Sequence, residues 1–255
     1  MDNDKIITAR IEDKLEQCER GSYITTTGFL NMHEQSLAMR IVKGRSDVKS
    51  FFYGGYDDAE RRIILFVPDG YADTLEGALE MISPLSVLHI KVAPGSRKLT
   101  HRDYLGSVLS LGLDRSVIGD ILVNDKGADM IVNSDIVDFL LSEFHSAGHT
   151  NLQITASDIG ELEVPEQRVK AVRDTLSSPR LDNVVSAAFH VSRSEAVRAI
   201  KGGIVFVNHE EVTKIDKRID EGDTIVVRGK GKAELAELAG LSKKGRIWAG
   251  FKVFI

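Results

Sequence analysis

Residues 179–230 read PRLDNVVSAAFHVSRSEAVRAIKGGIVFVNHEEVTKIDKRIDEGDTIVVRGK, and this stretch decides the fold of the C-terminal part of the chain. Ser178 before Pro179 is typical of a helix N-cap followed by the first helical residue. A helix is expected here because apolar residues recur at helical spacing. The apolar stripe consists of Leu181, Val184, Val185 and Ala188.

A second helix and a small sheet are expected to follow. Ser192 with Glu195 three residues later forms a capping-box pattern, and Gly202-Gly203 is typical of a helix end. Apolar residues then alternate around Asn208-His209, which indicates two short strands joined by a turn. Residues 225–228 return as a further strand after a second turn. The stretch therefore predicts a helix pair packed on a small sheet.

The charge of the chain divides unevenly along its length. The whole chain has 33 Lys+Arg and 38 Asp+Glu, which gives a formal net charge of −5. Residues 1–178 hold 19 basic and 28 acidic residues, whereas residues 179–255 hold 14 and 10. An acidic body with a basic C-terminal part favours a nucleic-acid partner for that part. The surplus of cations alone is equally compatible with chance.

The composition excludes several other classes of protein. A chain of 255 residues that is 42% hydrophobic and 28% charged is globular, neither disordered nor collagen-like. Its single cysteine excludes an internal disulfide framework and a thiolate zinc site. The N-terminus shows no signal peptide, and no apolar run reaches the roughly 18 residues of a membrane span. We therefore expect a cytoplasmic protein without membrane contact.

The residues before this part are expected to form two further small domains, so the fold class is α+β with three domains. Residues 1–83 are predicted to be an N-terminal α/β domain in which no chemistry is visible, and Cys18 in its first helix is expected to be a packing residue. Its helices are predicted at about 5–20, 31–43 and 74–82, and its strands at 48–53 and 63–67.

Residues 84–160 follow the order strand, helix, strand, strand, helix, strand. This order predicts a central ferredoxin-like (RRM-like) βαββαβ domain, but its strands lack the aromatic pair with which RRM domains stack bases. Residues 161–178 are polar and contain Pro165, and we expect a partly helical linker there. The C-terminal domain then spans residues 179–255, including a basic C-terminal extension.

The stretch quoted above resembles the RNA-binding domain of ribosomal protein S4 over about residues 179–230. The matching residues are Arg180-Leu181-Asp182, Ser192-Arg193, Ala196, Ile200, Gly203, Val205-Phe206-Val207-Asn208, Val212 and Gly222-Asp223-Thr224-Ile225. One departure is His209, because the S4-type domain usually has glycine after the asparagine; histidine tolerates a left-handed turn better than most residues. The resemblance implies a helix pair on a small sheet that clamps structured RNA.

The central part narrows the resemblance to one family. Residues 95–106, GSRKLTHRDYLG, together with residues 114–121, DRSVIGDI, are similar to the central domain of YlmH-type bacterial proteins, and the ending Lys243-Lys244-Gly245-Arg246 also resembles theirs. The resemblance implies binding of rRNA and tRNA on the large ribosomal subunit. Related small proteins with an S4-type domain hold stalled subunits that carry peptidyl-tRNA, so a role in translation quality control or ribosome rescue is implied. An association with cell division is a second implication.

The candidate RNA-binding residues are the basic side chains of this C-terminal domain. They are Arg180, Arg193, Arg198, Lys201, Lys214, Lys217, Arg228, Lys230, Lys243, Lys244 and Arg246. Arginine can pair with phosphate through two hydrogen bonds. We expect about half of these residues to touch RNA. Arg180 and Asp182 could instead pair with neighbours and fix the helix junction, and Lys214 and Lys217 could be an ordinary solvated edge.

A second RNA patch is expected in the central domain, with plain surface charge as the alternative. It consists of Arg97, Lys98, Arg102 and Arg115. Trp248 and Phe251 could stack on bases, but we expect the terminal strand to pack on its domain instead.

An RNA-modifying enzyme and a cell-division-associated interaction protein are the competing hypotheses. His101-Arg102-Asp103 matches three residues of the kinase catalytic loop, but position 108 is valine where kinases have asparagine. Arg180-Leu181-Asp182 resembles the catalytic motif of pseudouridine synthases without the run that follows it there. No Ser-His-Asp order, metal-spaced histidine pair or phosphate loop appears. We therefore expect no enzymatic activity, no cofactor and no metal.

Overall fold

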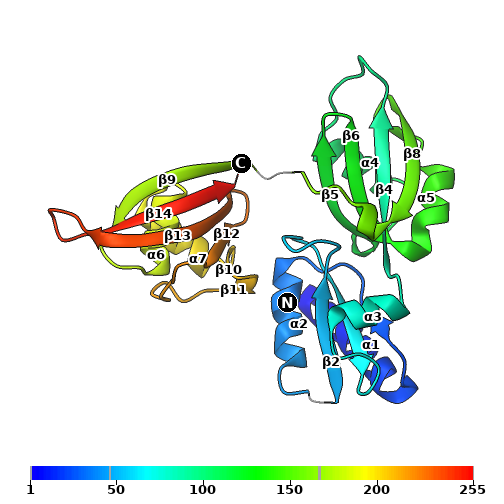
Figure 1. The fold of residues 1–255 in the computed structure, drawn as a ribbon, viewed down its shortest axis with the longest axis horizontal. Coiled ribbons are helices and arrows are strands. Elements are labelled where there is room, and N and C mark those ends of the chain that lie inside the picture. The colour runs from blue at the N-terminus through cyan, green and yellow to red at the C-terminus, as the bar shows by residue number, and fades with distance from the viewer. Residues whose placement is uncertain (1, 46, 166–167, 255) are drawn as a thin grey trace. The chain divides into compact units, whose positions relative to one another are not determined.

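A computed structural model describes residues 2–45, 47–165 and 168–254 (Figure 1). Contacts divide the chain into two compact units, Met1–Pro165 and Glu166–Ile255. Both units contain helices and mainly antiparallel strands, so the predicted α+β class is confirmed. The first unit has two halves that meet in a shared junction, and the second unit contains residues 179–230.

The N-terminal half of the first unit is a three-stranded antiparallel sheet with helices on both faces. Its strands follow the order β1-β3-β2. The elements are α1 (Asp2–Gly21), β1 (Thr25–Thr26), α2 (Met32–Val42), β2 (Val48–Tyr53), β3 (Ile63–Pro68) and α3 (Leu75–Met81). The three predicted helices and two predicted strands are confirmed; the two-residue β1 was missed.

The central strand β3 of this sheet is buried on both faces, which explains its continuous apolar run. On one face Ile64 and Phe66 pack against α1 and α2, where Cys18 is fully buried as a packing residue. On the other face Ile63 and Leu65 pack against α3 and against residues of the central half. The N-terminal half therefore shares one of its two cores with its neighbour.

The central half has the predicted ferredoxin-like arrangement, with β5-β6-β4-β8-β7 as the antiparallel strand order. Its elements are β4 (Leu85–Val92), α4 (His101–Leu109), β5 (Ile118–Asn124), β6 (Gly127–Asn133), α5 (Val137–Glu143), β7 (Ser146–Ala147) and β8 (Thr150–Asp158), with short 3-10 turns at Arg115–Val117, Ser134–Ile136 and Ile159–Glu161. The helices α4 and α5 cover one face through Tyr104 and Leu140. The short β7 is an addition to the predicted order.

The two halves of the first unit are joined by a polar junction. The amide of Phe29 donates to the carbonyl of Ser116 at 2.6 Å. The carboxylate of Asp120 accepts from the Tyr56 hydroxyl at 2.9 Å and from the amide of Glu60 at 2.7 Å. A Cβ at Gly28 would lie 2.8 Å from the Cβ of Ser116, so only glycine permits this approach. The predicted boundary at residues 83–84 thus falls inside one compact unit.

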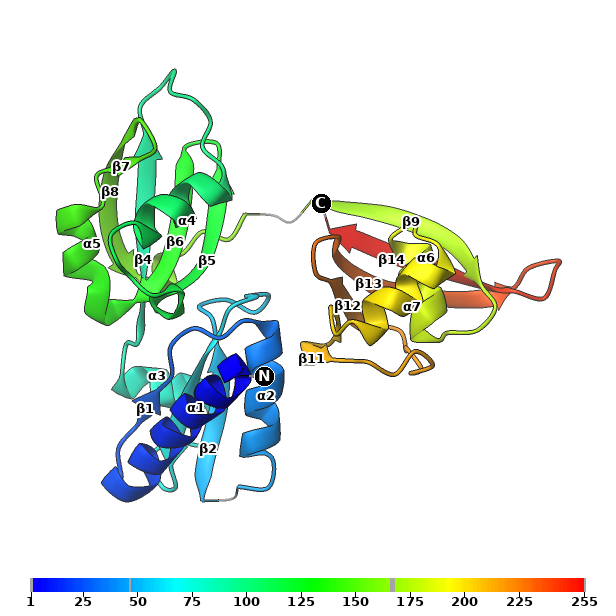
Figure 2. The same ribbon diagram turned by 180° about the vertical axis from the view of Figure 1, so that it is seen from behind.

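The second unit is a six-stranded antiparallel sheet with both helices on one face (Figure 2). Its strand order is β11-β10-β12-β13-β14-β9. The elements are β9 (Val169–Leu176), α6 (Leu181–Ala188), α7 (Arg193–Lys201), β10 (Val205–Val207), β11 (Glu210–Glu211), β12 (Thr224–Val227), β13 (Gly231–Leu241) and β14 (Ile247–Phe254). Side chains from α6 and α7 pack with Phe251 and Ala249 of β14 in a single core.

The prediction of a partly helical linker at residues 161–178 is wrong for residues 169–176, which form the edge strand β9. This strand pairs with β14 over its whole length. Val172 and Leu176 are its buried residues, whereas its other side chains are polar or exposed. Because only these two side chains of the edge strand are buried, its sequence shows almost no alternation of apolar and polar residues. Residues 166–167 of the predicted linker lie outside the described residues.

The turn Asn208-His209 adopts the left-handed conformation that the sequence requires. The φ angles are +50° for Asn208 and +69° for His209, as in the two-residue turns that join β-hairpins. The Asn208 side chain donates to Asp223 at 2.7 Å and accepts from the amide of Thr224 at 2.9 Å. Histidine in place of glycine is therefore compatible with the hairpin, as expected.

Candidate nucleic-acid interface

The centre of the basic helix face is a buried carboxylate, Asp182, near the start of α6. Its side chain is 1% exposed. It accepts from Nε of Arg180 at 3.1 Å and from Nε and a terminal nitrogen of Arg193 at 2.9 and 2.7 Å. Burial alone would raise the pKa of Asp182, but the hydrogen bonds and charges of the two guanidiniums outweigh it and hold the pKa below its usual value. The carboxylate therefore stays ionised and fixes both arginines.

Local sequence places these three residues at adjoining helix starts. Ser192 and Glu195 form the predicted capping box, which makes Arg193 the first residue of α7. Arg180 is the N-cap of α6. Both arginines remain accessible, because the side chains are 39% exposed for Arg180 and 61% exposed for Arg193. A guanidinium has five donors, so each arginine keeps donors for an anion from solvent. The sequence left open that Arg180 and Asp182 pair with neighbours at the helix junction; in the structure they pair with each other and with Arg193.

The loop before β12 brings two further predicted lysines to the same helix start. The amide of Leu181 donates to the carbonyl of Lys217 at 2.8 Å, and the amide of Asp182 donates to the carbonyl of Ile215 at 3.1 Å. Lys214 is exposed and Lys217 is half-buried. The same loop carries Arg218, which the sequence analysis missed although it lies within the run KIDKRID; its guanidinium pairs with Asp220 at 2.9 Å.

The other end of α7 carries Arg198 and Lys201, both exposed. The charge of Lys230, in the turn after β12, acts at the same helix: the pKa of Glu195 is lowered first by its hydrogen bonds with Ser192 and then by the charges of Lys230 and Arg198. We call the surface formed by these side chains and those around Asp182 the helix face. It comprises Arg180, Arg193, Arg198, Lys201, Lys214, Lys217 and Lys230. Arg228 lies over the ring of Phe206 at 5.5 Å and is apart from this face, because Val205 and Val207 on either side of Phe206 pack under the helices.

The remaining predicted residues of this unit lie apart from the helix face, on the hairpin between β13 and β14. Lys243, Lys244 and Arg246 are all exposed there. The hairpin turn is closed by the amide of Ser242, which donates to the carbonyl of Arg246 at 2.7 Å. Arg246 also donates to the carbonyl of Thr175 on β9 at 2.5 Å. The predicted RNA-binding residues therefore occupy two surfaces of the unit.

The predicted second patch is not a single surface. Arg97 pairs with Asp103 at 2.8 Å and Lys98 pairs with Asp125 at 3.3 Å, both exposed, and Arg102 is exposed on α4. Arg115 instead turns into the junction and donates to the carbonyl of Gly119 at 3.1 Å. Burial, and then the charge of Arg61, lower the pKa of Arg115 to about 10. The guanidinium of Arg115 thus stabilises the junction.

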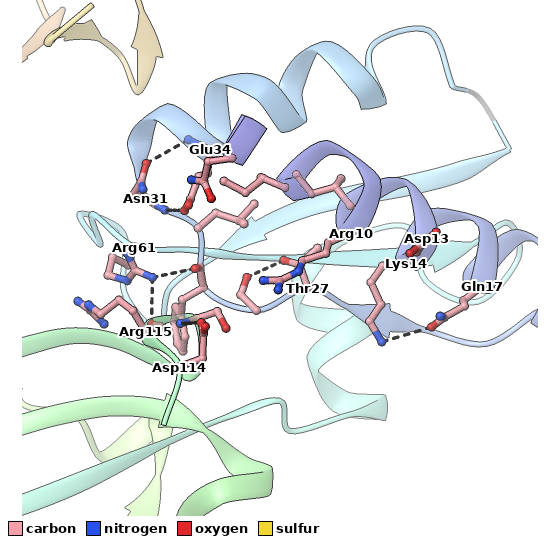
Figure 3. Close-up of a pocket in the computed structure, with 17 residues that line it drawn as sticks. Arg10, Asp13, Lys14, Gln17, Thr27, Asn31, Glu34, Arg61, Asp114 and Arg115 are labelled. Carbon is pink, nitrogen blue, oxygen red and sulfur yellow. Dashed lines mark hydrogen bonds between the residues drawn. The ribbon is translucent and has the colours of Figure 1, made fainter. Parts of the chain in front are cut away.

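The first unit also contains a pocket of about 430 Å³ at the junction of its halves (Figure 3). Its polar rim includes Arg10, Lys14, Glu34, Arg61, Asp114 and Arg115, and its apolar lining includes Ile11 and Phe29. No chemistry was visible in the sequence of residues 1–83, and no sequence signal marks this pocket, because its residues come from distant parts of the chain. Its rim mixes four cations with carboxylates, so its charge does not define one ligand.

A hydrogen-bonded Ser-His-Asp arrangement crosses the open face of the central sheet. Nδ1 of His89 lies 2.6 Å from Asp129, and Nε2 lies 2.9 Å from the hydroxyl of Ser157. The residues come from three strands, so no motif in the sequence reveals them. Within residues 2–45, 47–165 and 168–254, the structure has no group of three His, Cys, Asp or Glu side chains that could hold a metal. In the same ranges no helix is long and apolar enough to cross a membrane.

Two parts of the chain match known protein families. Family models match residues 84–161, described as the putative RNA-binding domain in YlmH, and residues 179–225, described as the S4 domain. The fold and the basic helix face thus define an RNA-binding protein with a C-terminal S4 domain.

Similarity over most of the chain then identifies the family. The Bacillus subtilis (strain 168) protein called "Ribosome-associated protein quality control protein P2" is 32% identical over 220 residues, which cover 86% of this chain and 83% of that protein. The chain belongs to the YlmH family. The solved structure "Cell division protein ylmH from Streptococcus pneumoniae" shares the fold, with a TM-score of 0.50 and 21% identity, over 62% of this chain and 93% of that chain.

Proposed function

We propose that this protein is a non-catalytic RNA-binding protein that docks its helix face on structured rRNA or tRNA, at the large ribosomal subunit, in cytoplasmic translation quality control. The observation that carries the proposal is the buried Asp182, which holds Arg180 and Arg193 at the meeting point of two helix starts. A guanidinium fixed by a carboxylate loses less side-chain freedom when it binds a phosphate. The helix N-termini add partial positive charge at the same place.

The proposed contact is electrostatic and should therefore depend steeply on salt. If four to six cations of the helix face each meet a phosphate, the logarithm of the affinity falls with the logarithm of the salt concentration with a slope of about −4 to −5. The acidic first unit, with its excess of carboxylates, keeps non-specific attraction to RNA low. Selectivity for one site then comes from the helix face itself.

The large-subunit and quality-control parts of the proposal rest on the relatives. The Bacillus subtilis relative is described as ribosome-associated and as a quality control protein. The second unit of this chain carries the S4 domain that it would use in such a role. Arg97 and Lys98 in the loop before α4, with Arg102 at the start of α4, add a candidate second contact; all three are exposed in the domain described as a putative RNA-binding domain.

The proposal that the protein is not an enzyme can be tested at Ser157. Its hydrogen bond to His89 resembles the start of a hydrolase triad. Such chemistry needs a nucleophile that opens into a pocket with donors aimed at a developing oxyanion. Ser157 is not among the residues that line the pocket beside His89, where the carboxylates of Glu161 and Glu163 are mixed with Lys91 and Lys126. We expect a fluorophosphonate probe to leave Ser157 unlabelled, as judged by intact mass; stoichiometric labelling that Ser157→Ala abolishes would contradict the proposal.

Binding to ribosomal particles tests the function directly. The purified protein is expected to co-sediment with large subunits at low salt and to bind structured rRNA or tRNA. Arg198→Glu with Lys201→Glu should weaken binding at least about tenfold, because each reversal removes a cation and adds repulsion. Neither change touches the Asp182 contacts.

The matched control reverses two exposed cations of the first unit, Arg40→Glu with Lys43→Glu, and carries the same change in net charge. This control is expected to bind like the unaltered protein. Absence of both subunit and RNA binding at low salt, or equal loss in the two double variants, would contradict the proposal.

A further inference from the structure

The second unit has a sheet face that the helix face leaves open. The core side chains Phe251 and Ala249 of β14 point to the side covered by α6 and α7. Because successive side chains of a strand alternate, Trp248 and Lys252 lie on the opposite side. Figures 1 and 2 show the two helices on one side of this sheet only. We call the opposite side the open sheet face.

Two cation–aromatic pairs lie on this open sheet face. The guanidinium of Arg173 on β9 lies over the Trp248 ring, 5.1 Å from its centroid. Trp248 is opposite Thr175 and Arg173 is opposite Gly250. Trp248 and Arg173 are therefore diagonal neighbours on two adjacent strands. Gly250 has no side chain to separate them. At the other end of β14, the Lys232 ammonium lies 4.6 Å from the centroid of the Phe254 ring.

The aromatic side chain at the hairpin end of this face is exposed. Trp248 is 38% exposed. A tryptophan needed only for packing would sit with its neighbours in the core, as Phe251 does at 1% exposure. An aromatic side chain kept at the surface beside a guanidinium is instead a surface on which another planar group can stack.

Cations surround this stacked pair. Lys243, Lys244 and Arg246 lie on the adjoining hairpin, and Arg246 donates to the carbonyl of Thr175, the residue directly opposite Trp248. Together with Arg173 they make four cations, against the carboxylates of Asp174 and Glu237 in the same strand ends. A partner that fits such a surface combines planar rings with negative charges at regular spacing.

We infer that the open sheet face binds single-stranded RNA, with one unpaired base stacked on the Arg173–Trp248 pair and the neighbouring phosphates held by the hairpin cations. Only a base that is not stacked on neighbouring bases can stack on an aromatic ring or a guanidinium plane. A regular duplex is therefore excluded as the ligand. The inference rests on the proposed RNA-binding function, but it uses a surface other than the helix face. An RNA with a structured part and an unpaired segment could occupy both.

Trp248 is the single tryptophan of the chain, so its fluorescence reports on this face without any substitution. Titration of the full-length protein with a ten-nucleotide oligouridylate is expected to quench the emission, whereas a duplex of equal length is expected to leave it nearly unchanged. Quenching by the single strand should persist in the Arg198→Glu, Lys201→Glu variant, since those residues belong to the helix face.

Affinity for the same oligouridylate, carrying a fluorescein and followed by anisotropy, tests the contact itself. Trp248→Ala is expected to weaken binding roughly 5- to 150-fold, the range measured for loss of one stacked base, and Trp248→Phe should restore most of it. Arg173→Ala should weaken binding in the same direction and serves if Trp248→Ala fails to fold, as judged by circular dichroism.

Different results would contradict the inference about the open sheet face and the proposed RNA-binding function. Unchanged Trp248 emission, together with oligouridylate affinity that is insensitive to Trp248→Ala and Arg173→Ala, would overturn the inference while structured-RNA binding still supported the proposed function. Quenching by an acidic aromatic peptide but not by oligouridylate would also overturn it. Loss of all RNA binding in the unaltered protein would contradict the proposed function as well.

Discussion

Two pairs of arginines in this molecule have opposite tasks. In the first unit, Arg61 and Arg115 turn inward and donate to backbone carbonyls, among them those of Phe29 and Gly119. In the second unit, Arg180 and Arg193 share the buried carboxylate of Asp182 and stay accessible. Burial lowers the pKa of Arg61 and of Arg115.

The difference shows what makes an arginine available to a ligand. At the junction, the donors of each guanidinium are already occupied by backbone carbonyls. Within the described part of the chain, no carboxylate is hydrogen-bonded to these guanidiniums to compensate their charge. A guanidinium held by one buried carboxylate is oriented and still keeps outward donors. We therefore expect changes to the first pair to affect stability alone, and changes to the second pair to affect RNA binding as well.

The largest effect is expected from Asp182→Ala. Removing the carboxylate leaves two guanidiniums without their partner, and we expect a loss of about 3 kcal/mol in the free energy of unfolding. This value is at the low end for a broken buried pair, because both arginines are partly exposed. Urea denaturation measures it, and RNA affinity should fall in the folded variant. Wild-type stability and affinity together would show that Asp182 does not organise the helix face.

A smaller loss is expected from Arg61→Ala. The backbone carbonyls of Phe29 and Arg115 lose their side-chain donor, while that of Ile118 keeps its bond from Arg115; we expect this to cost about 2 kcal/mol of unfolding free energy. RNA affinity at a temperature where the variant is folded should stay unchanged. The control Arg20→Ala removes only an exposed pair with Glu16 and should be nearly neutral. A drop in RNA affinity for Arg61→Ala would break the distinction between the two pairs.

Arg193→Ala sharpens the comparison through its salt dependence. It should weaken RNA binding by about 1 kcal/mol and make the salt slope shallower by about one. Arg115→Lys, which keeps the charge at the junction, should leave the slope as it is. The measurement is RNA affinity at several salt concentrations; equal slopes for Arg193→Ala and the unaltered protein would place Arg193 outside the phosphate contact.

The smallest effect concerns pH. The pKa of Asp182 in the folded protein lies below its usual value of 3.8. Its contribution to stability is therefore complete above about pH 4 and is lost as pH falls through the lowered pKa. The difference in unfolding free energy between the unaltered protein and Asp182→Asn should be constant from about pH 5 to 7 and should shrink below 3.8. A difference that grew on acidification would contradict the assignment of the shift.

Local sequence signals predicted much of the fold and part of the site. The capping box at Ser192 and Glu195 fixed the start of α7, and therefore the place of Arg193. The alternating strands and helices of residues 84–160 predicted the ferredoxin-like order. Both signals act within a few residues of one another, where propensity and periodicity are informative.

Features that depend on distant partners could not be predicted. The edge strand β9 is defined by its pairing with β14, and its own residues show little pattern. Arg115 was grouped with surface cations because its carbonyl partners and the nearby Arg61 are visible only in the folded chain. The pair of Arg173 with Trp248 likewise joins residues that lie far apart in the sequence.

The pairing of β9 with β14 has a consequence for the synthesis of the protein. The first strand of the second unit lies beside its last, Val169 opposite Phe254, so the sheet is complete only when β14 has left the ribosomal tunnel. Contacts between residues so far apart in the sequence slow folding. During translation, β9 therefore stays unpaired until β14 has been synthesised. A fragment that begins at residue 179 would lack this strand and expose the edge of β14 to pairing with other chains.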